Sequence, residues 1–214
     1  MPDYGSSNKS NRGRVLLLKL SKWIVTIAIF EEMQSTRTFS IRIAQPADAD
    51  AISSLLGASY SRLLTAFYDN DVLVRALPYF TKANPALLGC GTYYVAEREA
   101  GRIVGCGGWT PEKPLTREIA EGEAHVRHFA TDPAELRQGI GGTLLAHCIN
   151  EARLNCVRTL HCYSTLYAEP FYQAAGFNTI KSIALELSSG VTLPALLMTR
   201  ELGDRTDPDK EALF

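Results

Sequence analysis

The sequence has no surplus of charge of either sign. Its 214 residues include 22 Lys and Arg against 23 Asp and Glu, which gives a formal net charge of −1 at pH 7. Proteins that bind nucleic acid usually present a basic face, whereas no basic stripe with interleaved aromatic residues runs through this chain. We therefore expect no nucleic-acid partner.

Cysteine is scarce and scattered. The chain has five cysteines, an odd number, and no C-x-x-C pair. A disulfide framework needs paired cysteines, and structural zinc sites commonly use C-x-x-C pairs. The pattern therefore indicates free thiols in a reducing compartment, and we expect a cytoplasmic protein.

No hydrophobic run is long and clean enough to predict a membrane-spanning helix. Residues 15–30 are mostly apolar, but Lys19, Ser21 and Lys22 interrupt this run, and a spanning helix needs about 20 apolar residues. No small-residue cleavage site follows. Because the first thirty residues carry five Lys or Arg and one acid, three interpretations stay open: a weak membrane anchor, a surface amphipathic helix, or an extension outside the folded domain.

The composition predicts one folded domain. Apolar residues make up 46% and charged residues 21% of the chain, both close to the averages of globular proteins. We expect residues 1–36 to be a basic and apolar extension outside the core. One explanation is a start codon assigned upstream of the true one, near Met33. The domain then spans residues 37–202, and residues 203–214 form a polar tail.

The hydrophobic pattern predicts a mixed α/β sheet with helices on its faces. The expected strands are 38–44, 91–97, 102–111, 122–133, 157–164, 178–187 and 192–202, with the segment REAG over 98–101 as the hairpin turn between the second and the third. The expected helices are a pair over 45–64 broken near Gly57, followed by 71–80, 141–155 and 168–177, the last closed by Gly176. We expect a loop over 81–91, because it contains Asn-Pro and glycines.

Three glycines lie where the fourth strand gives way to a helix. Gly139, Gly141 and Gly142 would let a ligand approach the unpaired N–H groups of the helix N-terminus, which favours an anion such as phosphate. A P-loop would need Lys where Thr143 stands, and the dinucleotide motif G-x-G-x-x-G would need glycine at Leu144. The alternative is that the glycines only permit tight packing of the turn.

Two segments resemble the GNAT N-acetyltransferase superfamily. "HVRHFATDPAELRQGIGGTLLAHC", residues 125–148, resembles its cofactor signature, in which a strand with a β-bulge leads into R/Q-x-x-G-x-G/A and a helix. "AEPFYQAAGF", residues 168–177, resembles its later A-x-x-F-Y-x-x-x-G-F segment. The resemblance covers residues 38–202. It implies the GNAT fold, a mostly antiparallel central sheet flanked by helices, and acetyl-CoA-dependent N-acetylation.

The resemblance also implies how acetyl-CoA is held. The pyrophosphate is expected at the amides of the glycine turn, which comprises Arg137, Gln138, Gly139, Ile140, Gly141 and Gly142. The extended arm of the cofactor is expected to pair with the backbone of Phe129, Ala130 and Thr131, as an added strand would. The chain departs from the family at Leu136, where Arg or Gln is usual, with Arg137 and Gln138 next to it.

Tyr172 stands at the position of the family's catalytic tyrosine. A phenol with a pKa near 10 stays protonated at neutral pH and can protonate the departing thiolate. The resemblance therefore implies that Tyr172 is the general acid and contacts the cofactor, whereas a tyrosine on an amphipathic helix can also serve only packing. Tyr167, where the family often has Asn, is the second candidate.

The candidates for the general base lie on the strand before the glycine turn. Regular alternation would place Glu123, His125, Arg127 and Phe129 on one face of the strand and Val126, His128 and Ala130 on the other. Glu123 and His128 are therefore expected as catalytic residues, one from each face, with His125 as a further candidate. Because His125 and His128 would point to opposite faces, we expect no metal.

The acceptor is expected to lie over the first helices. Two acids there, Asp69 and Asp71, could attract a cationic amine near Tyr60, Arg62 and Tyr68. We expect the primary amine of a small molecule, in a monomer or homodimer. The alternatives are a protein lysine or N-terminus as acceptor, a non-catalytic module that binds acyl-CoA, and a membrane-tethered partner protein based on residues 15–30.

Overall fold

The computed structural model describes residues 39–188 and 190–203. The expectations for residues 1–36, and for most of the tail over 203–214, lie outside this part of the chain. Within the described ranges, no helix combines the length and the apolar character needed to cross a bilayer.

Seven strands form one sheet, in agreement with the predicted strand pattern. The strands are β1 (Ser40–Ile43), β2 (Tyr93–Glu97), β3 (Ile103–Thr110), β4 (Glu123–Thr131), β5 (Thr159–Ser164), β6 (Asn178–Ser188) and β7 (Val191–Glu201). Their order in the sheet is β1-β2-β3-β4-β5-β7-β6. The pairing of β4 with β5 is parallel, and the other neighbouring pairs are antiparallel.

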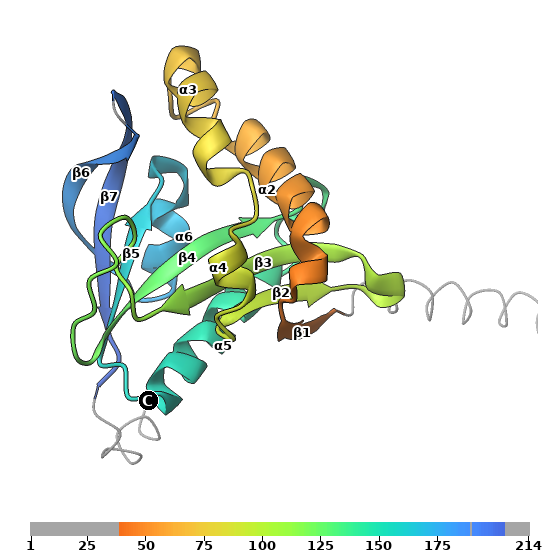
Figure 1. The fold of residues 1–214 in the computed structure, drawn as a ribbon, viewed down its shortest axis with the longest axis vertical. Coiled ribbons are helices and arrows are strands. Elements are labelled where there is room, and N and C mark those ends of the chain that lie inside the picture. The colour runs from red at the N-terminus through yellow and green to blue at the C-terminus, as the bar shows by residue number, and fades with distance from the viewer. Residues whose placement is uncertain (1–38, 189, 204–214) are drawn as a thin grey trace, which may run out of the picture. The chain divides into compact units, whose positions relative to one another are not determined.

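The helices lie on both faces of this sheet (Figure 1). The α-helices are α2 (Ala49–Leu63), α3 (Asn70–Phe80), α4 (Pro85–Leu88), α5 (Ile140–Leu154) and α6 (Glu169–Ala174). Short 3₁₀ turns are η1 (Pro46–Asp48), η2 (Glu99–Gly101), η3 (Pro133–Glu135) and η4 (Leu166–Ala168). This mixed arrangement confirms the predicted fold class.

The α5 helix covers one face of the sheet along the stripe predicted from its sequence. Leu144, Leu145, Cys148, Ile149 and Ala152 recur at helical spacing, and all five are buried. They pack with residues of β3, β4, β5 and β7 in the largest core cluster. The burial of this stripe fixes the helix against the sheet, and with it the position of the glycine turn at the N-terminus of the helix.

The α2 and α4 helices cover the opposite face. Ile52 and Leu56 from α2 and Leu87 from α4 pack against Val95 and Cys106 in a second buried cluster. The expected break near Gly57 is wrong, because α2 continues through this residue as one helix of 15 residues. A glycine without a proline beside it weakens a helix by only about 1 kcal/mol, which the buried face of α2 outweighs.

We expected a loop over 81–91, but this segment is partly helical. It contains the single helical turn α4, which starts at the pair Asn84-Pro85. The Asn84 side chain accepts a hydrogen bond from the amide of Ala86 at 2.9 Å. Proline is favoured at the first position of a helix, so the Asn-Pro pair acts here as a helix start rather than as a simple turn.

Tyr68 ties the first helices to the far strands. Its hydroxyl donates to the carbonyl of Pro194 at 2.9 Å and accepts from the amide of Leu166 at 2.8 Å. Leu73 of α3 and Leu193 of β7 belong to the same small buried cluster. The Tyr68 side chain therefore holds α3 over the C-terminal hairpin of β6 and β7.

Candidate active site

The β4 and β5 strands part after a short stretch of pairing. Their register pairs residues 123–125 with residues 159–161, and no later residue of β4 pairs with β5 (Figure 1). The second half of β4 therefore has no strand partner on its β5 side. Backbone groups at such an edge are available to a ligand that offers amide groups of its own.

A β-bulge shapes this free half of β4. Gly105 and Cys106 pair with Thr131 and Ala130, and Gly108 pairs with Arg127, so Gly107 faces two residues of β4. These are His128 and Phe129, and the bulge is the device by which two residues on one strand oppose one on its partner. His128 takes a left-handed conformation there, with φ +43°.

The bulge corrects the expected faces of the strand. Phe129 packs with Val126 in the cluster under α5, whereas Ala130 belongs to the cluster under α2. The expected alternation placed Phe129 with Arg127, and Ala130 with Val126. Because the bulge adds one residue, the alternation reverses after Arg127, and Phe129 points toward α5.

Gly107 makes this arrangement possible. A Cβ atom at Gly107 would lie 2.6 Å from the Phe129 ring. Three side chains hold the carbonyls of the bulge: the Tyr93 hydroxyl donates to the His128 carbonyl at 3.0 Å, the Cys106 thiol donates to the same carbonyl at 3.7 Å, and the Tyr60 hydroxyl donates to the Phe129 carbonyl at 3.1 Å. Side chains of α2, β2 and β3 thus fix the bulge.

An ionic network positions the loop between β4 and α5. Arg98 donates to Glu135 and to the side-chain oxygen of Gln138, at 2.7 Å each. Arg102 donates to Glu135 and, at 3.1 Å, to Asp132. Because the Gln138 side chain takes part in this network, its contribution to a bound anion would come from its backbone.

The N-terminus of α5 presents unpaired amides. Thr143 is the first residue of the helix whose amide has an intrahelical acceptor, the Gly139 carbonyl at 2.9 Å. The amides of residues 140–142 precede it and have no such acceptor. Gly139 adopts φ +81° and Arg137 adopts φ +65°, so two left-handed residues turn the chain into the helix.

The turn offers unpaired amides beside residues without side chains, as an anion site requires. A Cβ atom built at Gly139 or at Gly142 would meet no atom within 4 Å, so there is open space beside both glycines. The positive end of a 15-residue helix dipole lies at the same place. The predicted cofactor residues of the turn and those of the bulge are therefore brought to the same end of the parted strands.

Tyr172 lies on the α5 side of the sheet. Its ring packs edge-on against Phe129, Phe171 and Phe177, with centroid distances of 6.4, 5.0 and 5.5 Å. The side chain is buried, and its hydroxyl interacts with the thiol of Cys162. Burial, chiefly, raises the pKa of Tyr172 well above its usual value of about 10. The hydroxyl is therefore protonated at neutral pH.

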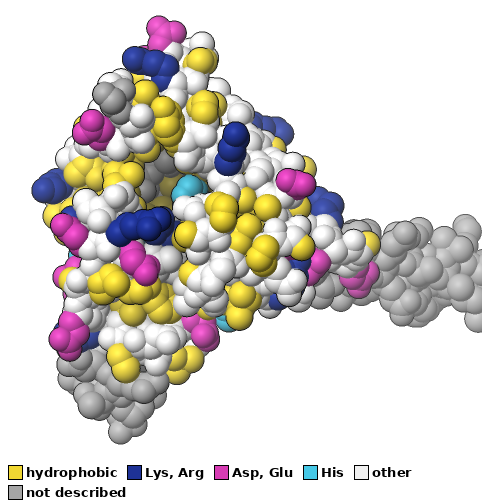
Figure 2. All heavy atoms as spheres, viewed as in Figure 1, with side chains coloured by type: hydrophobic (Ala, Val, Ile, Leu, Met, Phe, Trp, Pro, Cys, Tyr) yellow, Lys and Arg dark blue, Asp and Glu magenta, His cyan; other side chains and the backbone are white. Residues whose placement is uncertain are grey.

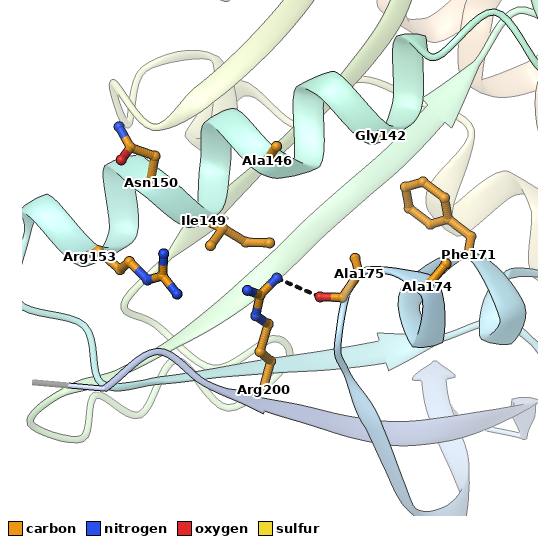
Figure 3. A pocket seen from close by; sticks show the side chains of 9 residues that line it. All are labelled: Gly142, Ala146, Ile149, Asn150, Arg153, Phe171, Ala174, Ala175 and Arg200. Carbon is orange, nitrogen blue, oxygen red and sulfur yellow. Dashed lines mark hydrogen bonds between the residues drawn. The ribbon is translucent and has the colours of Figure 1, made fainter. Parts of the chain in front are cut away.

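A groove runs between α5 and α6 from the glycine turn (Figure 3). Its volume is about 430 Å³. The lining residues are Gly142, Ala146, Ile149, Asn150, Arg153, Phe171, Ala174, Ala175 and Arg200. The Arg200 guanidinium donates to the Ala175 carbonyl, which fixes the end of α6 against β7. The small side chains of both helices leave the groove open next to Gly142.

A second cavity, of about 510 Å³, lies on the other side of the sheet. The residues that β4 and β5 contribute to it include Arg127, His128 and Tyr163. Figure 2 shows this face of the molecule, hollowed where a histidine side chain is visible, with a Lys or Arg side chain beside the hollow. The loop between β3 and β4 and the ends of α2, α3 and α4 complete the walls.

His128 is held in this cavity as a neutral imidazole. Burial, and to a smaller extent the neighbouring Arg127, lower its pKa to about 4, although a hydrogen bond to the carbonyl of Phe80 acts in the opposite direction. The ring nitrogen that donates to Phe80 carries the proton, so the other nitrogen keeps a free lone pair. His128 and Arg127 line the same cavity, contrary to the expectation of opposite faces.

Glu123 is not brought to this cavity. It begins β4, at the end far from the bulge, with its side chain 45% exposed, and it pairs with His161 at 3.1 Å. His125 is buried and stacks on His161 with ring centroids 5.1 Å apart. Among the residues that the structure describes, no group of three or more His, Cys, Asp or Glu side chains could hold a metal ion.

The acids of the first helices also lie away from the cavity. Asp69 and Asp71 are exposed at the start of α3 and do not line it, and neither does Arg62. Tyr60 does line it. The loop over 111–122 supplies the charged wall. Its role could not be predicted from the sequence, because no periodicity links a loop to a cavity formed by tertiary packing.

The parted strands, the bulge and the glycine turn together define the fold of acyl-CoA-dependent N-acyltransferases. Residues 89–179 match the family model described as acetyltransferase (GNAT) domain. Residues 89–179 are therefore similar to a GNAT acetyltransferase domain, and solved structures of N-acetyltransferases share the fold of the chain.

Solved structures share the fold. A GCN5-related N-acetyltransferase from Rhodopseudomonas palustris is 18% identical, with 77% of this chain and 96% of that chain covered and a TM-score of 0.59. The PaiA N-acetyltransferase from Thermoplasma acidophilum, solved with coenzyme A, is 14% identical, with coverages of 77% and 99% and a TM-score of 0.58. A ribosomal-protein alanine N-acetyltransferase from Escherichia coli is 16% identical, with coverages of 80% and 98% and a TM-score of 0.53. No curated protein matches the sequence.

Proposed function

We propose that the domain transfers an acetyl group from acetyl-CoA to the primary amine of a small molecule by direct attack. The observation that carries the proposal is the placement of two sites on the two sides of the β4 bulge. The glycine turn and Tyr172 lie on the α5 side, and a cavity of about 510 Å³ lies on the α2 side.

The chain's own amides would hold the cofactor. The N–H groups of residues 140–142 bind the diphosphate, and the free edge of β4 at Phe129, Ala130 and Thr131 pairs with the amides of the arm. The groove from Gly142 between α5 and α6 leaves room for the nucleotide end. When bound, acetyl-CoA supplies an acetyl thioester, whose carbonyl a β4 amide polarises.

Two side chains would transfer protons: Tyr172 as the donor and His128 as the acceptor. As the amine nitrogen bonds to the acetyl carbon and the C–S bond breaks, the thiolate takes the proton of Tyr172. His128, neutral at physiological pH, takes the proton that the amine nitrogen loses. Solvent returns that proton to Tyr172, so the sum is an amide and free CoA thiol.

The size of the cavity favours a small acceptor over a protein segment. Ligand sites for small molecules commonly enclose about 300–1,000 Å³, and the volume here, about 510 Å³, is within that range. The walls include the β3–β4 loop and residues of α3 and α4. An extended peptide would need a longer channel than a cavity of this volume provides.

A screen of amines tests the proposal. The full chain is incubated with acetyl-CoA and a panel of small amines, lysine peptides and N-terminal peptides, and the released CoA thiol and the acetylated product are both measured. We expect turnover with small amines and much lower kcat/KM with peptides. Preferred turnover of peptides would overturn the small-molecule assignment. Binding of CoA without turnover of any amine would instead identify a non-catalytic acyl-CoA-binding module.

A further inference from the structure

Arg127 lies partly buried in the wall of the acceptor cavity. Its Nη1 atom donates to the hydroxyl of Thr110 at 2.8 Å. No carboxylate of the described residues lies within 4.0 Å of its guanidinium, whereas Arg42, Arg98 and Arg102 all form ion pairs. Thr110 is therefore a neutral partner for a cation that has lost part of its hydration.

The surroundings of Arg127 do not neutralise it. Glu112 is the acid of the cavity wall that interacts electrostatically with it, without forming an ion pair. Lys113 is paired on the exposed rim with Glu118 at 3.4 Å, and Arg117 adds a further positive charge to the wall. Besides the paired Lys113, the cavity wall carries two cations, Arg117 and Arg127, and one acid, Glu112. The neighbouring His128 is neutral.

Burying a charged guanidinium costs free energy unless a carboxylate lies next to it. A bound ligand can supply this carboxylate. Burial lowers the pKa of Arg127, which expresses the same cost. Arginine presents several N–H groups in one plane and binds a carboxylate through two of them. One of its nitrogens donates to Thr110, and this contact orients the guanidinium.

We propose that the acceptor carries a carboxylate as well as the amine, and that Arg127 binds this carboxylate. The inference rests on the proposed function, since it names the substrate class of the same cavity. His128 and Arg127 are adjacent in β4 and line one cavity, so one small molecule can reach both. Leucines of the C-terminal hairpin, Leu185, Leu187 and Leu193, give the body of such a molecule an apolar wall.

The test compares matched amines. Each amino acid in the panel is paired with its carboxamide, its decarboxylated amine and its phosphonate analogue, and kcat and KM are measured separately. We expect kcat/KM of the carboxylate to exceed that of the carboxamide by about 10–100-fold, the range of a hydrogen bond to a charged group. Most of this difference should appear in KM. An equal or higher rate with the phosphonate would assign the site to phosphate-like anions instead.

Variants assign the effect to Arg127. In Arg127→Gln the ratio of carboxylate to carboxamide should fall to about one, and Arg127→Lys should restore part of it. Arg75→Gln removes an exposed cation of α3 that does not line the cavity, and it should keep the wild-type ratio. Unchanged affinity for CoA in all three variants shows that they are folded.

Binding separates this inference from the proposed function. Carboxylates without an amine are titrated calorimetrically into the complex with CoA, and we expect binding that Arg127→Gln abolishes. If no amine is acetylated, the proposed function fails, while this titration still decides whether the cavity binds carboxylates. A preference for carboxylates that persists in Arg127→Gln, or no preference in the wild type, would overturn the inference.

Discussion

The hydroxyl of Tyr60 donates a hydrogen bond to the carbonyl oxygen of Phe129 at 3.1 Å. This bond joins α2 to the bulge of β4, 69 residues further along the chain. It is a contact between the helices on the acceptor side and the strand predicted to pair with the cofactor.

Tyr60→Phe should therefore affect stability and cofactor binding together. We expect the free energy of unfolding to fall by about 1–2 kcal/mol, because the Phe129 carbonyl loses its side-chain donor. The affinity for CoA should fall several-fold, since the edge of β4 is less firmly held. Denaturant unfolding and calorimetry with CoA measure the two effects. A loss of stability with full CoA affinity would separate Tyr60 from the cofactor site.

Gly141→Asp should abolish CoA binding. The new side chain would place a carboxylate among the amides expected to bind the diphosphate, and its Cβ would lie 3.3 Å from the Thr131 hydroxyl oxygen. Loss of even one hydrogen bond to a charged phosphate costs about 1.5–3 kcal/mol, so we expect a decrease in affinity of at least about 10-fold.

Gly57→Asp is the matched control for this variant. It introduces the same charge in α2, where a Cβ meets no atom within 4 Å. Calorimetry should find wild-type affinity for CoA in this control. Undiminished affinity in Gly141→Asp would remove the turn from the cofactor site.

Tyr172→Phe should lower kcat by about 10²–10⁴-fold, the usual contribution of a general acid. The ring contacts with Phe129, Phe171 and Phe177 are retained in Phe. Affinity for CoA should therefore change little. Tyr167→Phe, which changes the second candidate, is expected to keep most of the activity. Equal losses in the two variants would argue against the assignment of Tyr172.

Acid should destabilise the protein through its buried histidines. The pKa values of His125 and His128 are lowered to about 4, mainly by burial, whereas an unfolded histidine has a pKa near 6.5. The unfolded chain then binds more protons between these two values. Stability falls as pH falls through this window, by on the order of 1 kcal/mol per pH unit for each histidine.

His128→Asn tests the contribution of one of the two. Asparagine tolerates the left-handed conformation at this position, so the bulge can persist. Thermal unfolding at pH 7 and pH 5 should show a smaller loss of stability on acidification than in the wild type. The same variant should lose activity at pH 7 if His128 accepts the proton of the amine. A pH dependence equal to that of the wild type would show that His128 is solvated.

The parts of the fold set by local pattern could be predicted, and those set by a partner strand could not. The buried stripe of α5 follows from its spacing, and Gly176 ends α6 with φ +79° as expected. The faces of Phe129 and Ala130 could not be predicted, because the bulge depends on Gly107 in the neighbouring strand. The position of Arg127 in a cavity could not be predicted either, since segments far apart in the sequence form the walls.

The place where β4 separates from β5 also decides what can pair with it. An unpaired strand edge at the margin of a sheet invites other proteins to add a strand and aggregate. Here the unpaired edge lies inside the sheet, between β4 and β5. These strands pair at their start, over residues 123–125 of β4, and then separate. A ligand that pairs with this edge must therefore enter between β4 and β5, so the protein keeps a strand-like recognition surface away from the outer edges of its sheet.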